Sequence, residues 1–230
     1  MLTWQMLLKP FKPPVVSFHF GLPSPELVAR IKSWGSVILS SATTVEEGIW
    51  LQSNGVDMVI AQGIEAGGHR AMFLTQDLSS QMTTNDLVSE LRQHLTVSII
   101  AAGGIGSRSD AERLMAMGCC GVQIGTAFLL CDEAKTSQVH RSAIQSGDSK
   151  TEVTNVFSGR PARGIINKVM LEQGFISSNA PCFPYASIAM APLRAKAESQ
   201  ENSDFSPLWA GMNTKGCRQS SAAHILQALS

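Results

Sequence analysis

The stretch VSIIAAGGIG, residues 97–106, decides the fold class, because an apolar run ends there in closely spaced glycines. A near-continuous apolar run of this length is typical of a parallel strand that is buried on both faces. The glycines after it indicate a tight turn from the strand into a helix. The next apolar run, residues 121–124, is followed by Gly125 and Thr126, so the strand-then-glycine pattern repeats one unit later.

Three earlier apolar runs extend this pattern toward the N-terminus. Expected strands begin at 15, 37, 58, 97 and 121, with spacings of 22, 21, 39 and 24 residues. Helix signals lie between them: Ser24-Pro25 as an N-cap followed by proline, capping boxes at 44–47 and 109–112, and stop signals at Gly55 and Gly118. The repeat indicates an α/β fold, either an open doubly wound sheet or a (β/α)₈ barrel. Glycines and polar residues gather after successive strands, which favours the barrel.

Only about five βα units are visible, so we predict an incomplete (β/α)₈ TIM-barrel type with a C-terminal helical appendage. Helical periodicity is found near 133–146, 164–173 and 186–200, ahead of a Ser/Pro/Gly-rich stretch. We therefore place a partial barrel in residues 1–132 and a helical appendage in residues 133–230. Two open sheet edges would then make the chain prone to self-association and weak in ligand binding.

Composition excludes several classes of protein. The 230 residues carry 18 Lys+Arg and 18 Asp+Glu, a formal net charge of zero, so no nucleic-acid or acidic-membrane partner is expected. A hydrophobic content of 44% excludes a largely disordered chain, and neither a membrane span nor a secretory signal is seen. The five cysteines have no CxxC spacing, which predicts small buried thiols and a cytoplasmic protein without a metal site.

The loop after the third strand carries the candidate for proton transfer. Residues 62–70, QGIEAGGHR, place an amide, a carboxylate, an imidazole and a guanidinium next to a strand end. His69 has the side chain whose ordinary pKa suits proton transfer near neutrality. His19 faces either the site or the core, whereas His94, His140 and His224 are expected on solvated helix faces. The glycine loops 101–106 and 123–126 predict a phosphate site of a cofactor or substrate, unless the glycines only make tight turns.

These motifs resemble those of the nitronate monooxygenase family, formerly called 2-nitropropane dioxygenases. The resemblance covers residues 14–220, and the Glu-Ala-Gly-Gly-His run at 65–69 is specific to the group. The barrels related to IMP dehydrogenase share the glycine loops but use a catalytic cysteine loop that we do not find here. The matching segments are 15–21, 40–43, 62–70, 101–105, 123–126, 157–164 and 205–211.

The resemblance implies an FMN-dependent (β/α)₈ enzyme that oxidises alkyl nitronates or nitroalkanes with O₂ to carbonyl compounds and nitrite. His69 would be the base that takes the α-proton from a neutral nitroalkane or orients a nitronate. Residues 1–132 would form the FMN-binding region, with no metal involved. The implied FMN contacts are Gln62 and Gly67 near the isoalloxazine ring, and Gly104, Gln123, Ile124, Gly125 and Thr126 at the phosphate.

The sequence departs from the family at Ala71, Met212 and the N-terminus. Family members usually carry glycine and glutamine at the first two positions, and a longer portion with three barrel strands ahead of Val15. This third departure has three interpretations: a truncated copy, a mis-started gene model, or half of a split barrel. Two alternative functions stay open: an FMN-dependent NAD(P)H:quinone or enoyl reductase, and an inactive remnant. The Arg160 and Arg163 pair is expected at a helix start, with a structural role favoured over anion binding.

Overall fold

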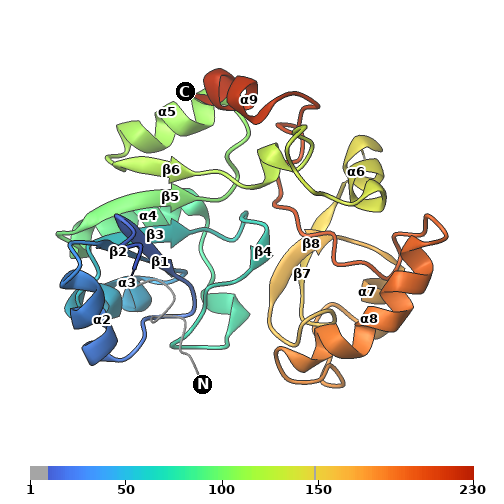
Figure 1. Cartoon of the computed structure of the whole chain (residues 1–230), viewed down its shortest axis with the longest axis horizontal. Helices are drawn as coiled ribbons and strands as arrows, with labels where there is room; N and C mark the ends of the chain where they lie inside the picture. The colour runs from blue at the N-terminus through green and yellow to red at the C-terminus, as the bar shows by residue number, and fades with distance from the viewer. Residues whose placement is uncertain (1–9, 148) are drawn as a thin grey trace. The chain divides into compact units, whose positions relative to one another are not determined.

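The computed structural model describes residues 10–147 and 149–230 (Figure 1). Contacts divide the chain into two compact units. The first takes the chain up to residue 64 together with 71–102 and 114–123, and the second takes 65–70, 103–113 and 124–230. The predicted domain boundary between 132 and 133 therefore remains a prediction, since the units interleave along the sequence.

The first unit is built on a parallel five-stranded sheet with the order β1-β2-β3-β5-β6. Neighbouring strands are in regular parallel register, for example Val16 opposite Ile38 and Ile60 opposite Ile100. The expected strand starts are confirmed to within one residue. The strands are β1 (Val15–Phe18), β2 (Val37–Ala42), β3 (Met58–Gln62), β5 (Ser98–Ala102) and β6 (Gly121–Gln123).

The helices of this unit begin where the sequence places their caps. Helix α2 (Pro25–Lys32) starts with Pro25 after Ser24, and α3 (Val45–Ser53) is capped by Thr44, whose hydroxyl accepts from the Glu47 N–H. The carboxylate of Glu47 does not complete that capping box. It accepts instead from the N–H and hydroxyl of Thr43 and from the N–H groups of Phe73 and Leu74. A fully buried carboxylate thus anchors the segment after residue 70.

Apolar side chains from the sheet and helices form the core of the first unit. Helix α4 (Thr84–His94) packs against α3 and against β3 and β5. Each fully buried leucine or isoleucine contributes about 1.5–3 kcal/mol relative to an exposed one. The fully or almost fully buried members include Ile31, Ile38, Leu51, Val59, Ile60, Leu87, Val88, Leu91 and Leu114.

The second unit contains an antiparallel three-stranded sheet that the sequence did not predict. Its order is β4-β8-β7, with β4 (Gly68–His69), β7 (Thr151–Thr154) and β8 (Ala162–Ile165). These strands are very short, and β8 buries Arg163 and contains a glycine, so no apolar run marks them. The stretch from 164 was expected to be helical, but the helix starts only at Lys168. Arg163 therefore lies on a strand and not at a helix start.

Helices and short 3₁₀ turns complete the second unit. Among its helices, α7 is capped by the side chain of Asn167 and α9 by Ser221. Helix α5 (Arg108–Ala116) begins in this unit. The remaining elements are α6 (Gln138–Gln145), α7 (Lys168–Gln173), α8 (Tyr185–Glu198), α9 (Ala222–Leu229), η1 (Leu78–Ser80, in the first unit) and η2 (Thr126–Phe128).

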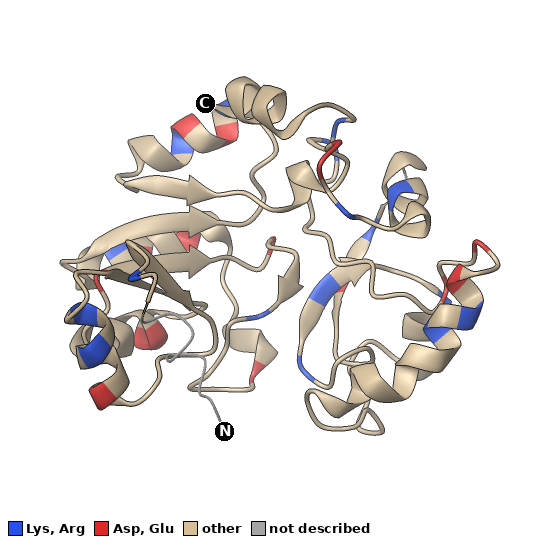
Figure 2. Ribbon diagram, viewed as in Figure 1, with Lys and Arg blue, Asp and Glu red and all other residues tan. Residues whose placement is uncertain are grey.

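Several side chains differ in solvent exposure from what the sequence predicts. Cys120 and Cys182 are exposed, so only part of the buried-thiol prediction holds. His19 follows β1 as an exposed residue stacked near Phe20, which excludes a core position. His140 was expected to be solvated, but it is half-buried. Lys, Arg, Asp and Glu are interspersed along the elements (Figure 2). No helix in the described ranges is long and apolar enough to cross a membrane.

Candidate functional site

His69 lies on β4, which the edge of β8 holds in place. Gly68 pairs with Arg163 and His69 with Ala162 in antiparallel register, and the Arg70 N–H donates to the Pro161 carbonyl at 2.8 Å. Gly68 has φ +75°, a left-handed conformation that favours glycine. The second glycine of the Gly-Gly-His run is therefore a requirement of the turn into β4.

Ser158 contacts the imidazole of His69. The distance from His69 Nε2 to Ser158 Oγ is 2.8 Å, and the same hydroxyl donates to the Arg160 carbonyl at 3.1 Å. When the Ser158 hydroxyl donates its single proton to the Arg160 carbonyl, Nε2 of His69 is the donor to Ser158 Oγ. In that tautomer the lone pair of a neutral His69 is on Nδ1.

Two aromatic side chains flank the same imidazole. The rings of Phe183 and Trp209 both lie with their centroids 5.6 Å from that of His69, and Phe157 packs edge-on against Trp209 at 5.7 Å. The Arg160 guanidinium lies 5.9 Å from the Phe183 ring centroid. Aromatic rings around an imidazole restrict its orientation and offer an apolar surface to a small alkyl group.

The two arginines Arg70 and Arg163 are buried and structural. Arg70 is 1% exposed and donates to the Ala66 carbonyl at 3.1 Å. Arg163 is 2% exposed, donates to the carbonyl of Thr151 at 3.0 Å and lies 4.0 Å from Glu152. Burial lowers the pKa of Arg163, and Glu152 and Glu65 oppose that effect. The structural role favoured for Arg163 thus agrees with its contacts.

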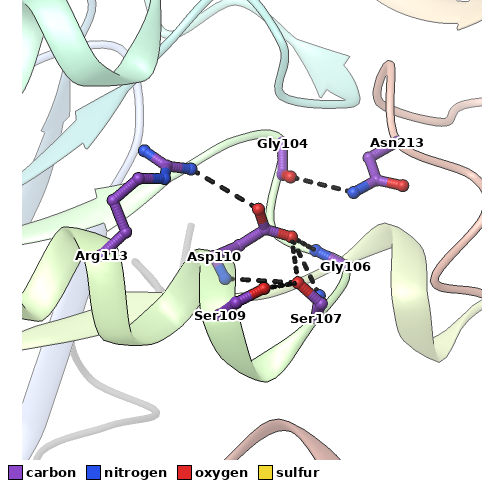
Figure 3. Close-up of polar contacts among 7 residues, drawn as sticks. All are labelled: Gly104, Gly106, Ser107, Ser109, Asp110, Arg113 and Asn213. Carbon is purple, nitrogen blue, oxygen red and sulfur yellow. Dashed lines mark hydrogen bonds and ion pairs between the residues drawn. The ribbon is translucent and has the colours of Figure 1, made fainter.

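The glycine loop after β5 leads into α5, whose N-terminus already holds a carboxylate (Figure 3). Asp110 Oδ2 accepts from the N–H groups of Gly106 and Ser107 at 3.1 and 3.0 Å and from the Ser107 hydroxyl at 2.7 Å. Ser107 Oγ accepts in turn from the Asp110 N–H. The capping box is therefore Ser107 with Asp110, and the predicted box at 109–112 is wrong by two residues. An external anion would have to use N–H groups earlier in this loop.

Gly104 and Gly125 differ in what a side chain would meet. Gly104 has φ +73°, and an added Cβ would lie 3.4 Å from the Cβ of Glu65. Gly125 has φ −119°, and a Cβ there would have no atom within 4 Å. Neither backbone strain nor internal packing requires glycine at Gly125, so the open space beside it fits an external group. Gly125 precedes η2, whose first N–H groups have no acceptor within the turn.

The segment 209–213 ties these loops together within the second unit. The Gly211 N–H donates to Thr126 Oγ1 at 2.9 Å, and Asn213 Nδ2 donates to the Gly104 carbonyl at 3.2 Å (Figure 3). The Met212 N–H donates to the Glu65 carbonyl. A Cβ on Gly67 would lie 2.5 Å from the Gly211 nitrogen, so Gly67 allows two backbones to cross closely.

Gln62 and Gln123 belong to the first unit, so their part in the site remains a prediction. Gln62 is 8% exposed, and its Oε1 accepts from the Ala71 N–H at 2.9 Å. Ala71 is fully buried, which leaves little room around the residue that departs from the family pattern. Gln123 is exposed at the end of β6, and Ile124 next to it is half-buried.

Sequence reasoning missed Ser158, Asn213 and the site role of Trp209. Ser158 and Trp209 lie inside the segments 157–164 and 205–211 that carry the family resemblance, so a signal was present without a role. Asn213 lies two residues beyond the end of the second of these segments. None could be assigned from spacing, because their contacts join residues separated by between 89 and 140 positions.

Comparison with known proteins identifies the family. The family model described as nitronate monooxygenase matches residues 4–230. The chain belongs to the nitronate monooxygenase family. It is 36% identical over 210 residues to a probable nitronate monooxygenase of Bacillus subtilis, covering 91% of this chain and 60% of that protein. It is 35% identical over 220 residues to a nitronate monooxygenase of Pseudomonas aeruginosa, with coverages of 95% and 63%.

Solved structures agree with the fold. A nitroalkane oxidase from Streptomyces ansochromogenes matches with a TM-score of 0.90 and 33% identity, over 97% of this chain and 65% of that one. FabK from Thermotoga maritima matches with a TM-score of 0.76 at 24% identity, a likeness of fold alone. The α/β fold of (β/α)₈ type with about five βα units is thereby confirmed. The chain spans about 60% of the length of the curated relatives named above.

Proposed function

We propose that this chain takes part in FMN-dependent oxidation of alkyl nitronates and nitroalkanes by O₂, giving a carbonyl compound and nitrite. The observation that carries the proposal is His69, held on β4 with its Nε2 atom 2.8 Å from Ser158 Oγ, in a chain of the nitronate monooxygenase family. Its substrates are small molecules, and we place the protein in the cytoplasm on the basis of its cysteine pattern.

The glycine loops of the second unit fit the phosphate of FMN. Gly125 leaves open space where a side chain would stand, and Thr126 keeps its hydroxyl proton for a further acceptor because its Oγ1 accepts from the Gly211 N–H. Gly104, Gln123, Ile124, Gly125 and Thr126 would hold the phosphate, with Gln62 and Gly67 near the isoalloxazine ring. When bound, the flavin supplies the redox chemistry.

His69 would act on the neutral nitroalkane before any oxidation. Its Nδ1 lone pair takes the proton from the carbon next to the nitro group, and the electron pair of that C–H bond moves into the nitro group to form the nitronate. Ser158 Oγ accepts a hydrogen bond from the Nε2 N–H throughout and so holds this tautomer. Phe183 and Trp209, whose rings flank the imidazole, would contact the alkyl group.

The test compares a neutral nitroalkane with its preformed nitronate. In the FMN-loaded 230-residue chain, His69→Ala should lower nitrite release from neutral nitroethane by about 10²- to 10⁴-fold, the usual contribution of a positioned base. Release from ethyl nitronate should fall much less, since that substrate has already lost its proton. His94→Ala, an exposed histidine at the end of α4, is the matched control and should leave both rates unchanged.

Two results would contradict the proposal. Equal losses on both substrate forms would exclude a base and leave His69 an orienting role. A chain that binds FMN but releases no nitrite from either form would exclude the activity itself.

A further inference from the structure

A polar cavity of about 370 Å³ lies in the second unit, between the start of α6, the C-terminal half of α8 and the segment 206–208. The residues that matter for its chemistry are Lys135, Ser137, His140, Arg194, Glu198 and Ser206. None of them belongs to the glycine loops or contacts His69. The volume falls within the range of small-molecule pockets, about 300–1,000 Å³.

Cationic groups of this cavity lack protein partners in the part of the chain that the structure describes. Lys135 makes no ion pair or hydrogen bond with any described residue. Arg194 uses only Nε, which lies 2.8 Å from Glu198 Oε1, so its two terminal nitrogens have no partner among those residues. A guanidinium offers a planar fork of donors that matches the oxygens of a phosphate.

His140 supplies an independent sign of a ligand. Its Nε2 is the one buried side-chain nitrogen or oxygen without a hydrogen-bond partner among the described residues. Burial lowers the pKa of His140, and Arg194 lowers it further, so the imidazole is neutral at pH 7 and carries one N–H donor. An unpaired buried polar atom is costly, and a small turn of the ring toward the cavity would let an acceptor there remove that cost.

The first turn of α6 adds donors on the same side. Ser137 is the N-cap residue, yet its hydroxyl makes no capping hydrogen bond. The first backbone N–H groups of an eight-residue helix have no acceptor within it, and its dipole favours an anion there.

The carboxylate of Glu198, which also lines the cavity, does not cancel the whole positive charge of Lys135 and Arg194. Glu198 accepts from Ser206 Oγ at 2.6 Å and from Arg194. Burial tends to raise the pKa of Glu198, but these two hydrogen bonds and the charge of Arg194 bring it below its ordinary value. With Glu198 ionised and paired, and His140 neutral, Lys135 leaves the cavity with a net positive charge of one.

We propose that this cavity binds a small phosphate-bearing molecule, with the phosphate held by Lys135, the terminal nitrogens of Arg194, Ser137 and the first turn of α6. His140 donates to a phosphate oxygen. The cavity is larger than inorganic phosphate alone needs, and Pro207 and Leu208 line it beside the polar groups, so the organic part of the molecule has room there. This site is separate from the proposed flavin and substrate site.

The experiment titrates the 230-residue chain with inorganic phosphate and with phenyl phosphate at constant ionic strength, followed by calorimetry. We expect saturable binding that Lys135→Gln weakens at least about tenfold, because a charge-assisted hydrogen bond is lost. Lys135 has no described partner, so this variant should fold as the parent does, which circular dichroism checks. Lys168→Gln removes the same charge from an exposed pair with Glu172 on α7 and should not change the affinity.

NMR of the histidine side chains provides a second readout. Phosphate should shift the ring signals of His140 and leave those of His224 unchanged, since His224 lies on α9 with its Nδ1 2.9 Å from Ser220 Oγ. The absence of saturable binding, equal weakening by both lysine variants or unmoved His140 signals would each overturn the proposal. Equally tight binding of acetate or succinate would overturn the phosphate assignment in favour of carboxylates.

Discussion

The hydrogen bond between His69 and Ser158 leads to a prediction that a purely structural serine would not fulfil. Ser158→Ala removes the hydroxyl that accepts the hydrogen bond from the Nε2 N–H. Both tautomers of His69 then become accessible, and a smaller fraction of the molecules has the lone pair on Nδ1. We expect the rate on neutral nitroethane to fall about tenfold, which corresponds to one net hydrogen bond, with little change on the nitronate. Steady-state rates on nitroethane and on its preformed nitronate check this.

The control for that variant is Ser177→Ala. Ser177 belongs to the same unit, and its N–H and carbonyl bond the side chain of Asn155 through backbone atoms that the substitution keeps. Identical losses on nitroethane and nitronate in Ser158→Ala would show that the serine supports the loop and not the base.

Gly125 permits a cleaner test of cofactor binding than Gly104 does. Valine at Gly104 is strained by φ +73° whatever binds, whereas φ −119° at Gly125 accepts any residue. Gly125→Val should therefore leave the melting temperature unchanged and weaken FMN binding by about tenfold or more, since its side chain fills the space reserved for the phosphate. Fluorescence titration measures this. Riboflavin, which has no phosphate, should bind poorly to the parent and equally poorly to the variant.

At the scale of single residues, the sequence predicted which residue could carry the chemistry, but it did not predict which residues that side chain contacts. His69 stands out because imidazole follows a strand and a glycine pair, a local pattern. Its partners Ser158 and Trp209 lie 89 and 140 positions away in the sequence, and His140 on α6 lines a cavity together with residues of α8. Such long-range contacts follow from the packing of the chain, which spacing alone does not specify.

The elements with repeated local signals were the ones that sequence predicted. Five parallel strands begin where apolar runs begin, and α2 and α3 start at the predicted caps. The strands β7 and β8 went unnoticed because their partners, and not their own residues, make them strands: β8 lies between β4 and β7 and buries a charged side chain. The capping box of α5 was shifted because two overlapping serine-and-acid patterns fit the same rule.

The hydrogen-bonded carboxylate of Asp110 leads to a prediction about how the stability of α5 depends on pH. Burial tends to raise the pKa of Asp110, but bonds from the Ser107 hydroxyl and from the N–H groups of Gly106 and Ser107, with Arg113 nearby, lower it below the ordinary value of 3.8. A carboxyl whose pKa is lower in the folded state stabilises the fold above its unfolded pKa, and this stabilisation is lost as the pH falls through the folded value. Asp110→Asn should therefore cost about 1 kcal/mol at pH 7 and less below pH 3.8.

Urea denaturation at pH 7 and pH 3 measures this difference. Glu112→Gln is the matched control: its side chain is 68% exposed and pairs only with Arg108 on the same helix in the described part of the chain. If Glu112→Gln destabilised the chain more than Asp110→Asn, the Ser107–Asp110 box would not be what holds the start of α5.

At the scale of the whole molecule, the fold class followed from chain order, whereas the predicted domain boundary at residue 132 stays a prediction. A cut at residue 132 treats the chain as two consecutive pieces, but residues 65–70 and 103–113 cluster with the C-terminal part. These are the two loops that leave β3 and β5 and carry His69 and Gly104. The loops at the ends of these strands thus belong to one compact unit, whereas the strands themselves belong to the other. No change of composition along the sequence marks this division.

The two outer strands of the sheet lead to a prediction about assembly. Among the described strands, β1 pairs with β2 and β6 with β5, and the outer strands of a sheet present a row of backbone N–H and C=O groups on their outer side. Such rows pair readily with another chain, and Val15 on β1 is 52% exposed. The 230-residue chain should therefore self-associate, with an apparent mass that rises with concentration in analytical ultracentrifugation. Val15→Lys places a charge on that edge and should shift the chain toward the monomer, whereas Ile49→Lys, on an exposed position of α3, should not. A chain that stays monomeric at every concentration, or responds equally to both lysines, would mean that these strand edges do not drive association.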